Sequence, residues 1–315
     1  MLLLPLPLAA SGDVTSEETT QSVGGSRGVA LAYAAFAAAE FEGAEAGREA
    51  SSAESRLSAN LSFAASRSRA FTLGFDYQYT RFEYDRIAGR DRDLHRMQIP
   101  LGFTWRGPAW NVDAAIAPGL STSSNVFNSF WRDGTGDDVI VTGRIEGSYR
   151  SAADRLRWLT GLAHDRAFGE PRLYPILGVL YSPRPALSMR LALPESELRY
   201  AASDRQYVSA RLYPAGHRWH VASEELGDNF DYRVEALRLE GNWSYRLLEA
   251  VWIDVSAGYE FRRHHRFIDD RRQLIDADLD DELFAAIGFR FGSAPIPWSH
   301  RPALQVPAGA DRPAR

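Results

Sequence analysis

The feature that most restricts the fold of this sequence is a strict alternation of apolar and polar residues. In Phe71–Thr80 every odd position is apolar or aromatic, and every even position is Thr, Gly, Asp or Gln. Successive side chains of a β-strand point to opposite faces, so this period of two indicates strands with one apolar and one polar face. The pattern recurs at 96–105, 110–117, 139–149, 237–246, 251–261 and 283–292. We therefore expect an all-β fold.

The connections between these segments alternate in length. Short ones are expected near 66–69, 106–109, 150–154, 182–185 and 247–249, and long polar ones near 83–92, 121–137, 223–230 and 264–281. Short turns at one end and long loops at the other are typical of an outer-membrane β-barrel. Alternation throughout gives about 14 strands, with Leu187–Leu193 and Glu197–Ala201 as short members. Merging those two gives 12.

Alternation alone also fits a soluble sandwich, which turns its apolar face inward. The aromatic residues favour a membrane barrel, because they gather beside the expected short turns, where rings with a polar tip settle at the lipid headgroups. A closed sheet of 12–14 strands also encloses more space than one layer of side chains fills. The predicted aromatic girdle consists of Trp105, Trp110, Tyr149, Trp158, Tyr181, Trp243 and Tyr245.

The sequence thus predicts a transmembrane, antiparallel, up-and-down β-barrel over residues 27–292, in the outer membrane of a Gram-negative cell. Residues 1–12 are apolar and end in small residues, which indicates part of a signal peptide. Residues 13–26 are expected to be flexible and 293–315, rich in Pro, Ala and Arg, to be a disordered tail. The expected partners are outer-membrane lipid, lipopolysaccharide and the barrel-assembly machinery.

Composition excludes several classes of function. The net charge of −5 argues against a nucleic-acid partner, which usually meets a concentrated basic face. The sequence contains no Cys, so disulfides, thiol catalysis and cysteine metal sites are excluded. No phosphate-binding glycine loop and no zinc motif is present. We expect no cofactor and no metal.

Charged residues occupy the polar face in the middle of the predicted strands. One interpretation is a charged constriction that selects solutes by size and charge. The other is a set of salt bridges that braces the wall and fills the lumen, and both require paired charges. The residues predicted to line the lumen are Arg96, Asp113, Arg144, Glu146, Arg238, Glu240, Asp254, Glu260 and Arg290.

The segment 264–282 concentrates charge of both signs. Its carboxylates at alternate positions resemble a site for a hard cation, but no Gly provides the sharp turn of a calcium-binding loop, which favours a solvated acidic loop. His264 and His265 are adjacent, so on a strand they point to opposite faces and make a poor metal site. Together with the nearby Arg residues, this segment also fits a surface that contacts an anionic lipid headgroup.

No pair of residues in the sequence marks a catalytic centre. A lipid-modifying barrel needs a Ser and a His close together on its outer face, with a third group that orients the His. His95 has no Ser beside it in the sequence, and His220 and Ser223, three apart, fall on opposite faces of a strand. We therefore expect no enzyme activity and no catalytic residue, with a lipid-modifying barrel as a further alternative.

One stretch resembles a family of bacterial outer-membrane barrel proteins with a domain of unknown function. The resemblance covers most of residues 55–292 and implies the fold and the location without an activity. It rests on Gly161-Leu162, Phe168-Gly169, Pro175–Gly178, Tyr181–Pro183, Leu193-Pro194 and Leu198–Tyr200.

The function expected from the sequence is a barrel with a polar, charged lumen. It would act as a narrow pore for small polar solutes or as a passive envelope component. The alternative is a surface-binding barrel whose long loops contact lipopolysaccharide or a partner.

Overall fold

A computed structural model describes residues 27–292, apart from residue 67 and segments 87–91, 152–154, 224–227 and 270–271. The domain boundaries predicted within 1–26 and 293–315 lie outside the described residues. None of the helices in the described part has the length and hydropathy of a membrane-spanning helix.

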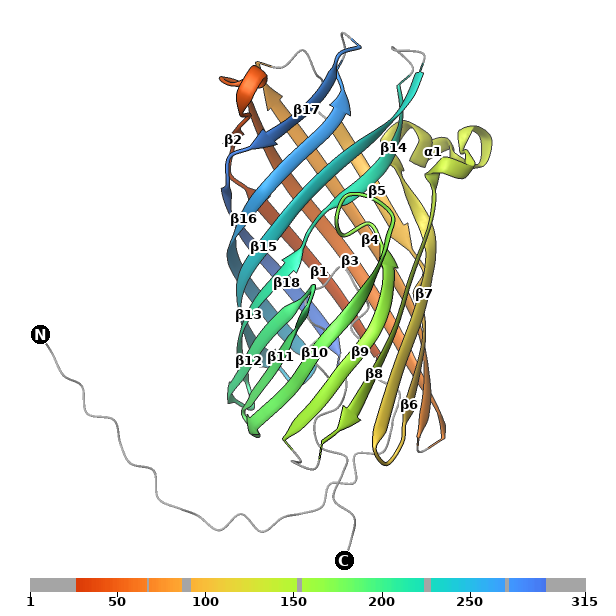
Figure 1. Cartoon of the computed structure of the whole chain (residues 1–315), viewed down its shortest axis with the longest axis vertical. Coiled ribbons are helices and arrows are strands. Elements are labelled where there is room, and N and C mark those ends of the chain that lie inside the picture. The colour runs from red at the N-terminus through yellow and green to blue at the C-terminus, as the bar shows by residue number, and fades with distance from the viewer. Residues whose placement is uncertain are drawn as a thin grey trace, which may run out of the picture.

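The chain forms one closed antiparallel sheet, with the first strand hydrogen-bonded to the last (Figure 1). Its strands are β1 (Arg27–Phe36), β2 (Ala39–Glu40), β3 (Glu49–Ser66), β4 (Arg69–Asp85), β5 (Arg92–Gln98), β6 (Leu101–Arg106), β7 (Trp110–Ser123), β8 (Val139–Arg150), β9 (Leu156–Asp165), β10 (Arg172–Arg184), β11 (Leu187–Leu193), β12 (Ser196–Ser203), β13 (Gln206–Pro214), β14 (His217–Ser223), β15 (Asp228–Leu248), β16 (Val251–Ile268), β17 (Leu274–Leu279) and β18 (Glu282–Gly292). The helices are η1 (Gly43–Glu45), α1 (Ser124–Asp133) and η2 (Gly136–Asp138).

The 18 strands form 14 continuous wall segments, because four of these segments consist of two consecutive strands each. The pairs β1–β2, β5–β6, β13–β14 and β17–β18 each continue one another along the wall. The predicted all-β barrel is confirmed, and the two short members at 187–203 are separate strands β11 and β12. Closure matters energetically, because an open edge in hydrocarbon leaves backbone groups unsatisfied at several kcal/mol each.

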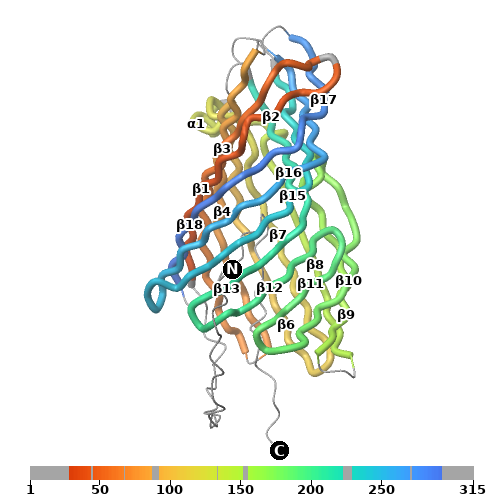
Figure 2. The backbone as a smooth tube through the Cα atoms, turned by 90° about the vertical axis from the view of Figure 1, so that its left-hand side faces the viewer, coloured from red at the N-terminus to blue at the C-terminus, as the bar shows by residue number. Residues whose placement is uncertain are grey.

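The two ends of the barrel differ. At the turn end, tight connections join β3 to β4, β6 to β7, β10 to β11, β12 to β13 and β15 to β16, and both β1 and β18 have their outer termini there (Figures 1 and 2). At the loop end, longer connections carry η1, α1 and η2. This asymmetry agrees with the alternation expected from the sequence.

Two of the predicted long loops contain regular structure. The stretch near 264–281 was predicted to be a loop, but β16 runs on to Ile268 and β17 spans Leu274–Leu279, so most of it is strand. The stretch near 121–137 contains α1, which the sequence reasoning missed. In both views α1 lies outside the barrel (Figures 1 and 2), and Figure 1 shows it beside the end of β7.

The apolar face of the strands points outward. Large apolar side chains on alternate positions of neighbouring strands are about half exposed, and together they form an apolar band around the barrel. Leu101 on β6, Ile145 on β8 and Ile287 on β18 are examples, while their sequence neighbours on the polar face point inward. An exposed apolar belt of this extent suits contact with acyl chains rather than water.

The loop end of the barrel is narrower than the turn end. Strands β8 to β12 stop short of it, and β14 crosses above them to meet β7 in a parallel bridge between His220 and Thr122. That residue pair and the bridge between Phe41 and Leu279, at the ends of β2 and β17, close what we call the narrow ring. It is formed by β2, β3, β4, β5, β7, β14, β15, β16 and β17.

Polar side chains around the end of β7 hold β14 in that position. Ser121 Oγ donates to the carbonyl of Arg218 at 2.7 Å and Thr122 Oγ1 to the carbonyl of His220 at 3.1 Å. Asn125 donates from its side chain to the carbonyl of Ala222. These bonds occupy carbonyls that a regular ladder would otherwise bond.

The start of β14 is fixed by the connection between β9 and β10. The amide of Gly216 donates to the carbonyl of Ala167 at 2.8 Å, and a Cβ at Gly216 would lie 2.5 Å from the nitrogen of Gly169. Gly169 itself has φ +81°, in the left-handed region that glycine adopts at no steric cost. Only glycine therefore fits at this contact without displacing the backbone.

Candidate functional site

The lumen contains a network of ion pairs centred on Arg238. This side chain is 4% exposed, and its guanidinium donates to Glu260 at 2.7 and 2.9 Å and to Glu54 at 3.2 Å. The rings of Phe36 and Phe284 lie 4.7 and 5.0 Å from the same guanidinium carbon. Arg238 is thus held by two carboxylates and by two aromatic faces.

A second cluster of ion pairs joins β8, β11 and β13. Glu146 accepts hydrogen bonds from Arg190 at 2.7 and 2.9 Å and from Arg144, its neighbour two residues away on β8. Arg144 also lies 3.8 Å from Glu195, which accepts from Arg211 at 2.6 Å. Each carboxylate of this cluster faces two guanidinium groups.

The remaining charges predicted for the lumen have polar partners as well. Asp254 pairs with Arg290, and Glu240 accepts from the hydroxyl of Tyr213 at 2.7 Å. Asp113 accepts from Thr104 at 2.8 Å and pairs with Arg106 at 3.1 Å, and Arg96 donates to Gln78 at 3.0 Å. The fully buried members of the predicted set are Arg238, Glu240, Asp254, Glu260 and Arg290. The half-buried members are Arg96, Asp113, Arg144 and Glu146.

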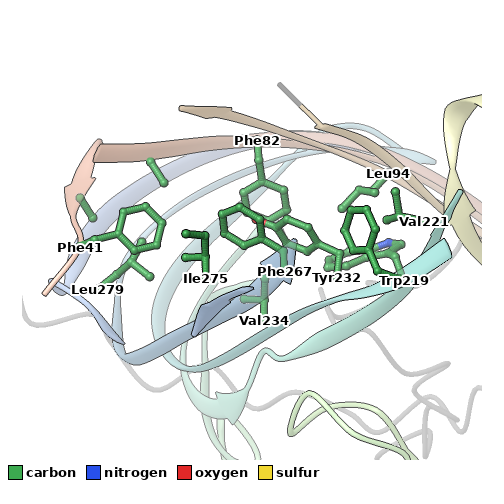
Figure 3. Packing of buried hydrophobic residues seen from close by; sticks show 13 residues of the cluster. Phe41, Phe82, Leu94, Trp219, Val221, Tyr232, Val234, Phe267, Ile275 and Leu279 are labelled. Atoms are coloured by element: carbon green, nitrogen blue, oxygen red, sulfur yellow. The ribbon is translucent and has the colours of Figure 1, made fainter. Parts of the chain in front are cut away.

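Above the ion pairs, the narrow ring is filled by apolar and aromatic side chains, which we call the aromatic plug (Figure 3). Phe82, Tyr232 and Phe267 stack in sequence, with ring centroids 5.1 Å apart at each step. Trp219 from β14 packs edge-on against Phe82 at 6.2 Å. The plug consists of Ala39, Phe41, Ala50, Phe82, Leu94, Trp219, Val221, Phe230, Tyr232, Val234, Phe267, Ile275 and Leu279.

Polar atoms inside the plug pair with one another. The hydroxyls of Tyr84 and Tyr232 are hydrogen-bonded, and the hydroxyl of Tyr232 lies 3.4 Å from Nδ1 of His265. His265 is fully buried beneath Phe82, whereas its neighbour His264 is on the outside and bonds Asp276 and Asp278 at 2.7 and 2.8 Å. The two histidines therefore point to opposite faces, as their adjacency on a strand requires.

The aromatic plug is not among the features predicted from the sequence, although the sequence contains a signal for it. On β4 the outward face carries Phe71 to Tyr79 at odd positions, but Phe82 and Tyr84 are aromatic at even positions. An aromatic residue that changes to the inward face marks where a strand leaves the apolar band and enters a packed interior. The same change occurs on β15, where Tyr232 shares its face with the charged Arg238.

The residues predicted for the aromatic girdle lie on the outside of the wall near the turn end. Trp110 and Tyr149 face each other on β7 and β8 with ring centroids 5.0 Å apart, and Trp243 stacks on Tyr245 at 5.7 Å. The exposed members are Trp110, Tyr149, Trp158, Tyr181 and Trp243, and the half-buried ones are Trp105 and Tyr245.

The charged side chains on the outward faces of the ends of β16 and β17 pair with one another. Besides the bonds of His264, Arg266 lies 3.6 Å from Asp276, and Arg263 reaches inward to Glu282 at 2.9 Å. In the described residues no group of three or more His, Asp or Glu side chains is arranged to hold a metal ion.

No family model and no curated protein matches this chain. Among solved structures, it is similar to a TodX monoaromatic hydrocarbon channel mutant, with 10% identity over 85% of this chain and 90% of that chain at a TM-score of 0.43. It is also similar to an outer-membrane channel from Pseudomonas putida F1, with 10% identity over 89% and 100% at 0.44, and to the translocator domain of the autotransporter NalP from Neisseria meningitidis, with 9% identity over 85% and 88% at 0.40. These likenesses do not assign the chain to a family.

Proposed function

We propose that this protein is an outer-membrane channel for small polar solutes, closed at its loop end in the described conformation. The proposal rests on the difference in polarity between the outer and inner faces of the closed barrel wall. The outer face is an apolar band, and the inner face holds paired charges. A wall of this kind separates lipid from a polar interior, which is what solute passage requires.

The location in the outer membrane is part of this proposal. Its support is the barrel's closed antiparallel wall, with tight turns at one end and longer connections at the other. By that rule the turn end faces the periplasm and the loop end faces the cell exterior. The aromatic plug then lies on the outer side of the lumen.

The closed state follows from the aromatic plug. Its rings are stacked at van der Waals distance inside the narrow ring, and Tyr232, Leu94 and Phe267 are at most 1% exposed. A hydrated ion cannot share that space, because its charge would lose its water without gaining a polar partner. Conduction therefore requires the plug to move.

Single-channel recording in planar bilayers tests this proposal. The plug variant Phe82→Ala/Tyr232→Ala removes two stacked rings, and the control Phe71→Ala/Phe103→Ala removes two rings 5.3 Å apart on the lipid-facing surface. We expect rare, brief openings from the wild type and the control and sustained conductance from the plug variant.

The recording also distinguishes a channel from a passive envelope component. A plug variant that inserts, keeps the mobility of a folded barrel on gels and is as silent as the wild type contradicts the channel proposal. If it conducts, adding Glu146→Gln removes a negative charge beside Arg144 and Arg190, so the reversal potential should move towards anion selectivity.

A further inference from the structure

The structure brings together a serine and a histidine that lie 29 residues apart in the sequence. Nε2 of His95 is 2.7 Å from Oγ of Ser124. His95 is on β5 and Ser124 is the first residue of α1. The register of β5 with β7 pairs His95 with Thr122 and Leu94 with Ser123, so the chain delivers Ser124 to the histidine as it leaves the wall.

A third group holds the other side of the histidine ring. The hydroxyl of Tyr77, on β4, is 2.8 Å from Nδ1 of His95. With the ring proton on Nδ1, His95 donates to the Tyr77 oxygen, and its Nε2 is left to accept the proton of Ser124. Ser124, His95 and Tyr77 thus stand in the order of nucleophile, base and orienting group, the arrangement that activates a catalytic serine. The orienting group can be neutral, as the Asn of papain-like proteases is.

The site is on the outer surface of the barrel. His95 shares a face with Ile99, which is exposed in the apolar band, while its neighbour Leu94 is buried in the aromatic plug on the other face. His95 and Ser124 are both half-buried. Strand β5 carries no exposed large apolar side chain, so the pair lies just beyond the edge of the apolar band, where lipid meets water.

Helix α1 adds an apolar surface beside the serine. The ring of Phe127 stacks on His95 with centroids 4.5 Å apart and an angle of 10° between the planes. Further along, Trp131 is 98% exposed on a helix that projects from the wall (Figures 1 and 2). A fully exposed Trp at this level is suited to the interfacial region of a bilayer.

One further feature suits ester chemistry. Burial lowers the pKa of His95 below its ordinary value, with Asp93 opposing the change, so the ring is a neutral base near pH 7.

We propose that Ser124, His95 and Tyr77 form an esterase site on the outer face of the barrel that cleaves the acyl esters of membrane glycerophospholipids. The substrate class follows from the position of the site at the edge of the apolar band and from the apolar surface of α1. The activity is independent of the lumen and goes beyond the proposed channel function.

The reaction balances with water as the second substrate. Oγ of Ser124 attacks the ester carbonyl carbon while its proton moves to Nε2 of His95. The bond to the glycerol oxygen breaks, that oxygen takes the proton, and a lysophospholipid leaves an acyl group on Ser124. Water then attacks the acyl carbon and gives a proton to His95, which returns it to Oγ of Ser124 as the fatty acid leaves.

The test uses the refolded full-length protein in mixed micelles of Triton X-100 and dioleoylphosphatidylethanolamine, with release of oleic acid as the readout. Ser124→Ala and His95→Ala should each lower the rate by about 100-fold or more, and Tyr77→Phe by about tenfold. The control Ser129→Ala removes another hydroxyl from α1, which donates to the helix carbonyl of Asn125, and should retain the wild-type rate.

A second readout does not depend on turnover. A fluorophosphonate probe should label the wild type and Ser129→Ala at Ser124, as read by peptide mass spectrometry, and should leave folded Ser124→Ala unlabelled. If the folded wild type neither releases oleic acid faster than Ser124→Ala nor takes the label at Ser124, the proposal is wrong. In that case the Ser124–His95 bond serves only to dock α1 on the wall.

Discussion

The ion pair between Arg238 and Glu260 provides the most direct test of how the lumen is stabilised. Replacing Arg238 with Met keeps much of its length and removes its charge. Glu260 and Glu54 would then lose a partner at 2.7 and 3.2 Å inside the barrel, where Glu260 is only 6% exposed. Removing one member of a buried ion pair costs about 3–5 kcal/mol, because the other charge loses its compensation. Glu260 would keep only the more distant Arg263, at 3.7 Å, so we expect the lower part of that range.

That cost corresponds to a loss of roughly 10² to 10⁴ in the folding equilibrium constant. The measurement is equilibrium unfolding in urea from phospholipid vesicles, followed by tryptophan fluorescence and by the gel mobility of the folded barrel. The matched control is Arg81→Met. Arg81 pairs with Glu83 at 3.0 Å, but both side chains are about half exposed, so that loss should cost less than about 1 kcal/mol.

A double substitution separates charge from packing. If the uncompensated carboxylates cause the loss, Glu54→Gln/Glu260→Gln in the Arg238→Met background should recover part of it. Equal destabilisation by Arg238→Met and Arg81→Met would refute the reasoning, since the pair in the lumen would then be no more buried in effect than a pair on the surface.

Three further predictions follow from the wall, the narrow ring and the outer site. Ile145→Arg puts a charge in the apolar band and should cost about 2–4 kcal/mol in the same urea titration if Ile145 lies near the bilayer midplane, whereas a cost near zero would contradict lipid contact. Gly216→Val places a Cβ 2.5 Å from the nitrogen of Gly169, so trypsin should cut the connection between β9 and β10 faster than in the wild type, and equal rates would contradict the tight contact. The rate of ester cleavage should fall to half its maximum at a pH below 6.5, the ordinary pKa of histidine, because burial lowers the pKa of His95 although Asp93 opposes the change. The other titratable groups around the ring are Tyr77 and Tyr79, and a midpoint above pH 6.5 would contradict this assignment.

The barrel fold could be predicted from the sequence because its signal, the alternation of apolar and polar residues, is local and repeated. Alternation places Phe71 and Leu101 outward and their neighbours inward wherever a strand is paired on both sides, so fold and facing follow without knowledge of long-range contacts. The strand count was harder to predict, since β11 and β12 are short and their connection is as tight as a turn.

The candidate sites depend on contacts that no local pattern contains. Tyr232 meets Phe82 across the narrow ring, and Ser124 meets His95 because two strands pair in one register and α1 begins directly after β7. A serine that is distant from His95 in the sequence can therefore lie beside it in the fold. The stretch at 264–281 was predicted to be a loop because its charge is high. In the structure β16 pairs with β17 there, and His264 bonds Asp276 and Asp278 across the two strands.

Because β14 also contacts β7, the strands form two closed rings: the full barrel and, at its loop end, the narrow ring, whose strands belong to both. The full barrel is sealed by long ladders, such as the nine residue pairs from Gly28–Gly292 to Phe36–Phe284, and needs nothing from the contact between β14 and β7. The narrow ring is closed between β14 and β7 by one residue pair and a few side-chain bonds. Detachment of β14 from β7 would thus open the loop end of the lumen and leave the full barrel intact. The free energy of opening is therefore separate from the free energy of unfolding.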